Sequence, residues 1–460
     1  MRYIFKFSNV TMKNSILYIF SFIFSLSVFA DNENYDGQDV SGLDFRGASY
    51  VDSSWIDCTA IGTIFSDSQS NSDYSNSNFT GADLTNANLS GGDFTNANFT
   101  NANLSKVEGE YVYAFFSFAI FTNADFTNSI INGRSFKDTI GFTTQQFEST
   151  LSFKNKDLSY ISPCIDISSL DLTDFNISGT NFSDTNLRAE QLYSTANYKN
   201  KNLRNVGFYT GDYSGWNFVG QNLQNTHWKK SIITNADATG ADLRGASFPF
   251  GDYTGEFITK NTIMSDGVIQ NFSMKSGADS LIIREHVPEH PEYGDYQISA
   301  KIAEDADISG GARLALEEGA KLEVLSGQTL TVASSGILAI HTDAATSTTV
   351  TVDSSAALVF ENGAVLEINI NCDEISHDVL RIAVMDFDDG ARIAGLDALV
   401  KGETVLLNVN GSEWLGEWDY ALENSQILIT VAIPEPAVCA AAIGCLLYTS
   451  PSPRDMRRSR

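Results

Sequence analysis

The chain of 460 residues is poor in cysteine, histidine and basic residues. Its five cysteines are scattered, so they form neither a disulfide framework nor a zinc-ligand spacing. Only 29 lysines and arginines stand against 57 acidic residues, which gives a formal charge of −28. Such a surface repels nucleic acid and anionic membranes and keeps an extended molecule soluble. We therefore expect no nucleic-acid partner and predict that Cys58 and Cys164 lie inside the fold as small apolar residues.

Groups for catalysis or metal binding are equally sparse, since there are five histidines and no glycine-rich phosphate loop or nucleophile elbow. One acidic and histidine-containing segment holds two histidines that could bind a metal with nearby carboxylates. Two prolines within it, Pro288 and Pro291, favour a solvated surface loop instead. The segment comprises Glu285, His286, Glu289, His290, Glu292 and Asp295.

Two further motifs give weak chemical signals. Cys372 and His377 lie close in sequence, but nothing indicates a third group that would orient a Cys/His nucleophile. Asp386–Gly390 resembles the opening of a calcium loop, yet the acidic residue at the twelfth position is missing, and a loose count reaches only Asp397. We interpret this motif as a turn and assign no catalytic, cofactor-binding or metal-binding residue.

Large side chains recur every five residues in two long stretches. Neither an α-helix nor a flat strand has this period, so a short unit copied many times and stacked into a solenoid is indicated. The first series is Tyr74, Phe79, Leu84, Leu89, Phe94, Phe99 and Leu104. The second is Tyr198, Leu203, Phe208, Tyr213, Phe218, Leu223, Trp228, Ile233, Ala238, Leu243, Phe248 and Tyr253.

Small residues stand two positions before most of the large ones, and Asn, Asp, Ser or Thr fill the positions between. Residues two apart in an extended segment point the same way, so the large and small residues can share one interior while the polar residues form turns. The run ADLTN-ANLSG-GDFTN-ANFTN resembles the pentapeptide-repeat family. That resemblance implies an all-β fold for residues 31–255: a right-handed quadrilateral β-helix with four pentads per coil.

Interruptions of this pattern predict local distortion. The phase slips near Ser70, between Lys106 and Ile120, and around Pro163. Larger residues replace the small one at Glu190, Lys201, Trp216 and Gln221, where we expect distorted coils. In addition, Gln146–Leu158 resembles Gln191–Leu203 at an offset of 45 residues, which we interpret as an internal duplication.

From about Tyr296 the period becomes eight. Pairs of apolar residues, one residue apart, alternate with Gly or Ser turns, which predicts short strands in a second β-solenoid over 296–372 with three sides per coil. This region looks like the parallel β-helix of secreted passenger-type bacterial proteins, and an antiparallel sandwich or meander is the competing hypothesis. Residues 256–295 would be a linker, and 373–432 a capping β region that protects the open end.

The N-terminus predicts export. Basic residues precede an apolar stretch from Ile16 to Phe29, and Val28 and Ala30 provide the small residues expected before cleavage. We therefore interpret residues 1–30 as a secretory signal peptide.

The C-terminus, residues 433–460, contains Pro434-Glu-Pro436, an apolar stretch and a basic end. It resembles the PEP-CTERM sorting signal, which implies recognition in the membrane by an exosortase-type protease in an exopolysaccharide-producing bacterium. The apolar run from Ala437 to Tyr448 is shorter than the ~20 residues that span a bilayer. An artefactual end from about Cys445 would explain this departure.

The leading functional hypothesis is an exported, non-enzymatic structural or interaction protein without a cofactor. It would reside at the cell surface or in the extracellular matrix of a Gram-negative-type bacterium. Its partners would be the sorting protease, exopolysaccharide and, transiently, the membrane during export. The oligomeric state stays open.

Three alternatives remain at this point. One is a carbohydrate- or ice-binding solenoid that uses rows of hydroxyls such as Thr80, Thr85, Thr95 and Thr100. Another is a carbohydrate-active β-helix enzyme that uses exposed carboxylates. DNA mimicry toward a topoisomerase, which the resemblance to acidic pentapeptide proteins suggests, conflicts with a signal peptide because that target is cytosolic.

Overall fold

The computed structural model describes residues 33–432, except 48, 67–71, 90–91, 106–115, 249–252, 289–296, 344–348, 372–378 and short stretches between 389 and 425. The chain divides into two compact units, Met1–Asn200 with Val206–Gly211 and Lys201–Asn205 with Asp212–Arg460. The predicted signal peptide and sorting tail lie outside the described residues. No helix in the described ranges combines the length and hydropathy that crossing a bilayer requires.

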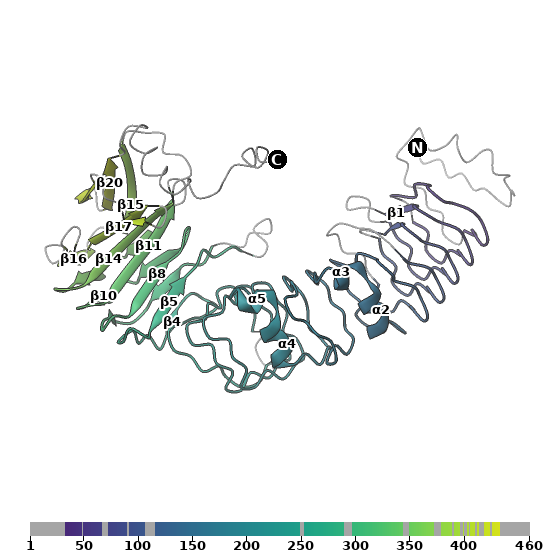
Figure 1. Cartoon of the computed structure of the whole chain (residues 1–460), viewed down its shortest axis with the longest axis horizontal. Coiled ribbons are helices and arrows are strands. Elements are labelled where there is room, and N and C mark those ends of the chain that lie inside the picture. Colours follow the sequence, from purple (N-terminus) through teal and green to yellow (C-terminus); the bar gives the residue numbers. More distant parts are fainter. Residues whose placement is uncertain are drawn as a thin grey trace, which may run out of the picture. The chain divides into compact units, whose positions relative to one another are not determined.

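In the first unit, single residues of successive coils pair in parallel at a spacing of 20 residues. Asn34 pairs with Ser54, Asn78 with Asn98, and Asp83 with Asn103. Twenty residues are four pentads, so the predicted four-pentad coil is confirmed (Figure 1). The spacing rises to 24 between Ser49 and Asp73, which places the expected phase slip near Ser70. Two short parallel strands, β1 (Ile64–Ser66) and β2 (Asn88–Leu89), pair within this stack.

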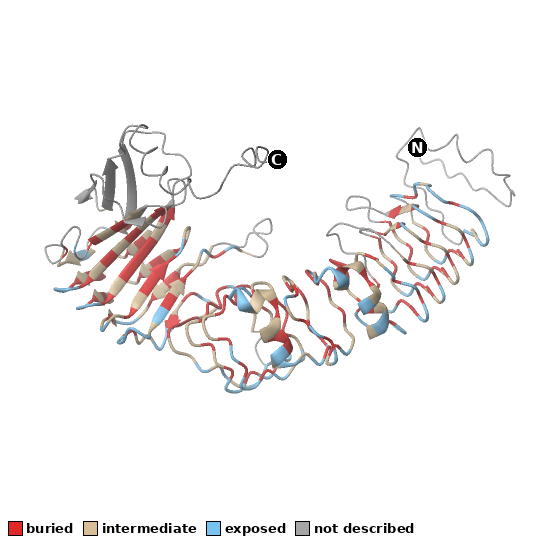
Figure 2. Cartoon of the chain, viewed as in Figure 1, coloured by how far each residue is buried: buried red, intermediate tan, exposed pale blue. Residues whose placement is uncertain are grey.

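Each pentad turns through a residue with a left-handed backbone. Asn76, Asn86 and Asn96 have φ near +60°, a conformation that asparagine tolerates better than most residues. The carbonyl of each large residue accepts the amide of the small residue three positions on, as from Ala82 to Phe79 at 3.1 Å. In most pentads the large and small side chains are buried together while the turn residues are more exposed, so burial alternates around most coils (Figure 2).

Aromatic side chains stack from coil to coil inside the first unit. Tyr35, Trp55, Phe79, Phe99 and Phe121 form one column, with centroid distances of 4.0, 5.6, 4.9 and 5.2 Å and nearly parallel rings. Cys58 is buried, as expected, whereas Cys164 is half-buried. Burial raises the pKa of both thiols to about 12.

Two pairs of short helices interrupt the coils, which the periodicity did not predict. They are α2 (Thr144–Ser149), α3 (Leu151–Lys154), α4 (Ala189–Ser194) and α5 (Ala196–Lys199). The pairs are 45 residues apart, so the sequence duplication corresponds to a repeated helical insert. The expected distortion at Glu190 is therefore a helix. Tyr198, which keeps the five-residue period, lies in α5 and outside the coil.

The second unit begins with coils of the same kind. Asn202 pairs with Asn222, Asn217 with Asp237, and Asn222 with Asp242, each 20 residues apart. The distortion expected at Trp216 and Gln221 is wrong, because both side chains are buried within regularly spaced coils. Trp216 packs edge-on against Tyr213, with 4.9 Å between ring centroids.

A three-sided parallel solenoid follows, as the eight-residue period predicted; the antiparallel alternative is wrong. We call its sheets J, K and L, with strand orders β19-β20-β15-β12-β9-β6, β16-β13-β10-β7 and β18-β17-β14-β11-β8-β5. Strands β5, β8, β11, β14 and β17 of sheet L are labelled in Figure 1. The strands of the first coils are β5 (Ser280–Ile283), β6 (Ala300–Ile302), β7 (Ala306–Ile308), β8 (Arg313–Leu316), β9 (Lys321–Val324) and β10 (Thr329–Val332). The next are β11 (Ile337–Asp343), β12 (Thr349–Val352), β13 (Ala357–Phe360) and β14 (Val365–Asn371).

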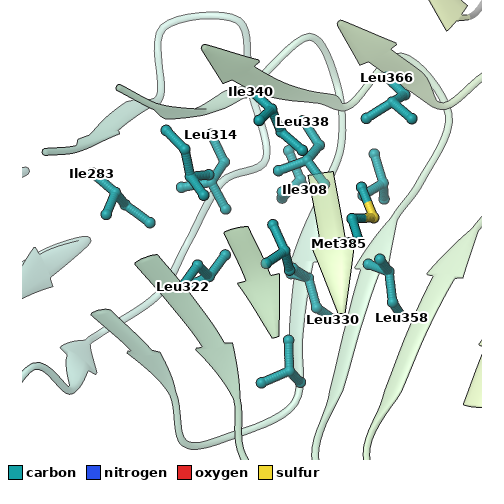
Figure 3. Packing of buried hydrophobic residues seen from close by; sticks show 14 of the residues in the cluster. Ile283, Ile308, Leu314, Leu322, Leu330, Leu338, Ile340, Leu358, Leu366 and Met385 are labelled. Atoms are coloured by element: carbon teal, nitrogen blue, oxygen red, sulfur yellow. The ribbon is translucent and has the colours of Figure 1, made fainter. Parts of the chain in front are cut away.

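Consecutive strands belong to different sheets, so each strand pairs with the third strand after it. Leu314, Leu338 and Leu366 occupy equivalent positions on three strands of sheet L. Together with Leu322 of sheet J and Leu330 and Leu358 of sheet K they converge on one apolar core (Figure 3). The residue between the two members of each apolar pair faces outward.

The solenoid continues beyond its predicted end at residue 372 and starts before residue 296. Its last strands are β15 (Val379–Phe387), β16 (Arg392–Ala394) and β17 (Val405–Val409), all paired in parallel with the preceding coil. Antiparallel partners follow: β18 (Ser412–Glu413), β19 (Trp418–Glu423) and β20 (Gln426–Ala432). The range expected as a linker contains β5 and the antiparallel pair β3 (Thr262–Ile263) and β4 (Ile269–Gln270).

Candidate functional site

The sequence motifs that suggested metals do not assemble into a metal centre within the described ranges, where no three His, Cys, Asp or Glu side chains come together. His286 is buried, with 3% of its surface exposed, so it does not lie in a solvated loop. Asp386 lies in β15, not in a turn, and accepts a hydrogen bond from the Gln426 amide at 2.6 Å. Glu289, His290, Glu292, Asp295, Cys372, His377, Gly390 and Asp397 lie outside the described residues.

The four threonines proposed as a binding row fall into three separate columns. Thr80 and Thr100 stack in successive coils, because the amide of Gly81 donates to the carbonyl of Thr100. The turns of Thr85 and Thr95 belong to two other columns. Three of these hydroxyls donate to the side chain two residues earlier, as Thr80 does to Asn78 at 2.6 Å. The hydroxyl rows therefore stabilise their own turns.

A buried ion pair lies where the coils of the second unit meet the solenoid. The Asp242 carboxylate accepts from the Arg244 guanidinium at 3.0 and 2.7 Å, and both side chains are fully buried. The Gln224 amide donates to the same carboxylate at 2.8 Å. Burial raises the pKa of Asp242, but the charge and hydrogen bonds of Arg244 outweigh it, so the carboxyl pKa lies below its ordinary value.

Two described stretches, residues 284–288 and 297–298, supply the remaining acceptors of this ion pair. Arg244 donates to the carbonyls of Arg284 and Ile298. The two stretches also contact each other, because the Nδ1 atom of His286 accepts the Ile298 amide at 3.1 Å. Burial, with a further contribution from the Arg244 charge, lowers the pKa of His286 to about 4. The network is therefore a structural joint that requires a neutral imidazole at neutral pH.

The outer face of sheet L carries a group of polar side chains that could bind a ligand. His341 pairs in register with Asn369, and Asn369 with Asn408. Ile283, Leu316 and Ile340 pair in register one residue earlier, so Arg284 and Glu317 continue the same column. We call this column, together with Arg313 and Glu367, the sheet L ladder.

Side chains of the ladder contact one another across strands. The Arg313 guanidinium on β8 binds the Glu367 carboxylate on β14 through both of its terminal nitrogens, so the pair spans the strand between them, β11. The Asn369 amide donates to Glu367 at 3.1 Å and lies 3.4 Å from the His341 ring. Asn408 donates to the Asn369 oxygen at 2.9 Å. The hydrogen bond from Arg313 lowers the pKa of Glu367, so this carboxyl is ionised at neutral pH.

The comparisons with known proteins bear on the coils. Residues 75–108 and 217–248 match the model of the family described as pentapeptide repeats, with eight copies. These two segments are pentapeptide repeats. One lies in each compact unit, and both lie in the stretches where parallel bridges recur every 20 residues. No curated protein matches the chain.

Several solved structures of pentapeptide repeat proteins are similar at low identity. HetL, from the cyanobacterium Nostoc sp. strain PCC 7120 and involved in heterocyst differentiation regulation, is 15% identical over 53% of this chain and 90% of its own, with a TM-score of 0.20. QnrB1, a plasmid-mediated fluoroquinolone resistance protein, is 15% identical over 51% and 92%, with a TM-score of 0.19. AT2G44920, from the Arabidopsis thaliana thylakoid lumen, is 22% identical over 22% and 68%, with a TM-score of 0.17.

Sequence reasoning missed the ladder because its members are far apart in the chain. Arg313 and Glu367 are 54 residues apart and meet only because β8, β11 and β14 are neighbours. A usable signal was present: the residue between each apolar pair faces outward. Because the strands alternate among three sheets, every third of these outward residues belongs to the same sheet. In sheet L they are Ala315, Ala339 and Glu367, which lie in one register row.

Proposed function

We propose that this protein is an exported, non-enzymatic structural or interaction protein of the cell surface or extracellular matrix. The observation that carries the proposal is the regular coil stacking within each unit. In each unit, parallel pairs at fixed register hold outward side chains at a spacing of about 4.8 Å per coil. Such a surface presents the same groups repeatedly in a fixed geometry, which suits a passive scaffold.

The proposed localisation is supported by the two ends of the chain. The apolar stretch before Asp31 supports export, and the tail after Ile433 supports sorting by an exosortase-type protease. The test is to express the chain with and without residues 433–460 in a bacterium that carries such a protease. Loss of surface or matrix retention on deletion supports the proposal. Unchanged retention of the truncated chain contradicts sorting by the tail.

The non-enzymatic part of the proposal needs a separate assay. The purified chain is incubated with exopolysaccharide and the reducing ends are counted over time, with a polysaccharide lyase or hydrolase as positive control. We expect no increase above the buffer control. A time-dependent release of reducing ends would contradict the structural role and favour the carbohydrate-active alternative.

A carbohydrate-binding solenoid is the second candidate, and the sheet L ladder favours it. Amide, imidazole, guanidinium and carboxylate groups on one flat surface are the donors and acceptors that sugar hydroxyls require. The ladder is pre-organised because its members already hydrogen-bond to one another across strands. Binding would then add adhesion to the scaffold role.

A further inference from the structure

We propose that the outer face of sheet L binds a neutral, hydroxyl-rich polysaccharide that runs along the solenoid axis, across the strands. This inference rests on the proposed matrix role and deepens it by naming the surface and the ligand class. The surface consists of the sheet L ladder and the outward residues beside it, drawn from five consecutive parallel strands, β5, β8, β11, β14 and β17 (Figure 1).

Hydrogen bonding along the axis comes from three neighbouring side chains. His341, Asn369 and Asn408 stand in one register row on β11, β14 and β17. All three are half-buried, so they are partly fixed and still reachable from water. Adjacent strands are about 4.8 Å apart, close to the length of one sugar unit in an extended glycan. Each successive sugar could therefore meet the next side chain of the row.

Apolar contact is available beside this row. Ile337 and Val365 are paired in register and face outward on β11 and β14, and both are half-buried. Arg313 shares the register row of Ile337 and Val365, and its partner Glu367 stands in the next row, between these apolar residues and the polar row. A pyranose ring has an apolar C–H face and a hydroxyl edge. Its apolar face can lie on Ile337 and Val365 while its hydroxyls hydrogen-bond to the polar row.

Charge decides between a neutral and an acidic glycan. Both arginines of the ladder face a carboxylate: Arg313 is bound to Glu367, and Arg284 lies 4.0 Å from Glu317. Two positive and two negative charges leave the ladder balanced within a chain whose formal charge is −28. An acidic polysaccharide would find no net positive charge on the ladder, and the negative charge of the rest of the chain would repel it. A neutral polysaccharide is therefore favoured.

The test is affinity electrophoresis of the purified full-length chain in gels containing hydroxyethylcellulose or laminarin, which are neutral, or alginate, which is acidic. His341→Ala, Asn369→Ala and Asn408→Ala each remove one donor or acceptor of the row. Thr331→Ala and Thr351→Ala are matched controls, because these residues face outward from β10 of sheet K and β12 of sheet J. Thermal melting confirms that each variant is folded.

We expect a neutral glycan to retard the wild-type chain and the control variants equally. The double variant His341→Ala/Asn369→Ala should bind about thirtyfold more weakly, because two hydrogen bonds of roughly 1 kcal/mol each are lost. Three results would overturn the proposal: no retardation by either neutral glycan, equal or stronger retardation by alginate, or equal loss in the control variants. A failure here leaves the localisation result untouched, because sorting by the tail does not require glycan binding.

Discussion

The same short motif, Asp-x-Arg-Gly, occurs in two coils with opposite surroundings. In Asp44–Arg46 the two side chains bond at 2.9 and 2.6 Å and are 40% and 44% exposed. In Asp242–Arg244 the distances are 3.0 and 2.7 Å, and neither side chain is exposed. A pair in water contributes little to stability, whereas breaking a buried pair leaves one charge uncompensated.

Replacing Asp242 with Asn should therefore destabilise the second unit by about 3–5 kcal/mol, because the Arg244 guanidinium stays buried without its counter-charge. Asp44→Asn is the matched control and should cost less than about 1 kcal/mol. Urea unfolding of each variant, monitored by tryptophan fluorescence, measures both. Equal losses for the two variants would show that burial does not set the energy of this motif.

His286 makes the same joint sensitive to acid. The imidazole faces Arg244, Asp242 and Arg204, and its folded pKa of about 4 lies below the ordinary value of 6.5. A folded pKa below the unfolded one means that the unfolded chain binds the extra proton first. The stability that the neutral His286 contributes to the fold is therefore fully present above pH 6.5 and is lost as the pH falls toward 4.

We expect the melting temperature of the second unit to fall as the pH is lowered from 6.5 to 4.5. The variant His286→Gln should lack this fall. The full effect of the shift is about 3 kcal/mol, since one pKa unit corresponds to about 1.4 kcal/mol. His341→Gln, at a half-buried position on the outer face of sheet L, is the control and should melt like the wild type across this range. If His286→Gln retains the whole pH dependence, the joint does not respond through this residue.

At the scale of the element, the duplicated helical inserts show how a coil accommodates residues that do not fit a pentad. The Gln191 amide donates to the carbonyls of Ile167 and Leu170 at 2.8 and 2.7 Å. Gln146 does the same for Phe121 and Ala124 at 2.9 and 2.7 Å. Thr150 and Thr195 then cap the second helix of each pair. The glutamine thus gives the carbonyls of Ala124 and Leu170 a donor, and it adds a second hydrogen bond to the carbonyls of Phe121 and Ile167, which already accept a backbone amide.

Gln191→Ala should cost about 1–3 kcal/mol, because the Leu170 carbonyl loses its side-chain donor and the Ile167 carbonyl loses one of its two hydrogen bonds. Gln146→Ala should cost less, since Gln146 is only half-buried and water can replace its amide. Gln145→Ala, at an exposed position in α2, is the control with no expected effect. Chemical denaturation ranks the three variants. A cost for Gln145→Ala as large as that for Gln191→Ala would contradict this role.

The helices also show where sequence reasoning reached its limit. The offset of 45 residues was visible, but a period of five predicted coil at Tyr198, which lies in α5. The five-residue signal records only spacing, and a helical insert of suitable length preserves spacing without preserving the coil. The eight-residue signal was more reliable, because each apolar pair is itself a strand whose two side chains face one core.

At the scale of the whole molecule, each coil contacts mainly the coil before and the coil after it. In such an array a local defect is felt by its neighbours and fades with distance along the stack. The aromatic column makes this testable, because Phe99 stacks on Phe79 at 4.9 Å and on Phe121 at 5.2 Å.

Phe99→Ala should raise amide hydrogen exchange around Phe79 and Phe121, because the fully buried ring leaves a cavity that costs about 3–5 kcal/mol. The amides of β10 in the second unit should keep wild-type protection. Leu338→Ala is the reciprocal control and should affect the solenoid core and spare the aromatic column. Exchange followed by mass spectrometry reads both regions at once, and a uniform rise in both variants would contradict nearest-neighbour stabilisation.

The sequence by itself determined the two solenoid styles, because each pentad and each eight-residue unit buries its own side chains at a constant phase. Only the tertiary structure decided which polar residues would matter. Asp242 differs from Asp44 because its partner Arg244 also donates to the distant carbonyls of Arg284 and Ile298, and Arg313 meets Glu367 because three strands pair in parallel. Burial and cross-strand contact depend on segments about 40–60 residues away, and local patterning carries no information about those segments.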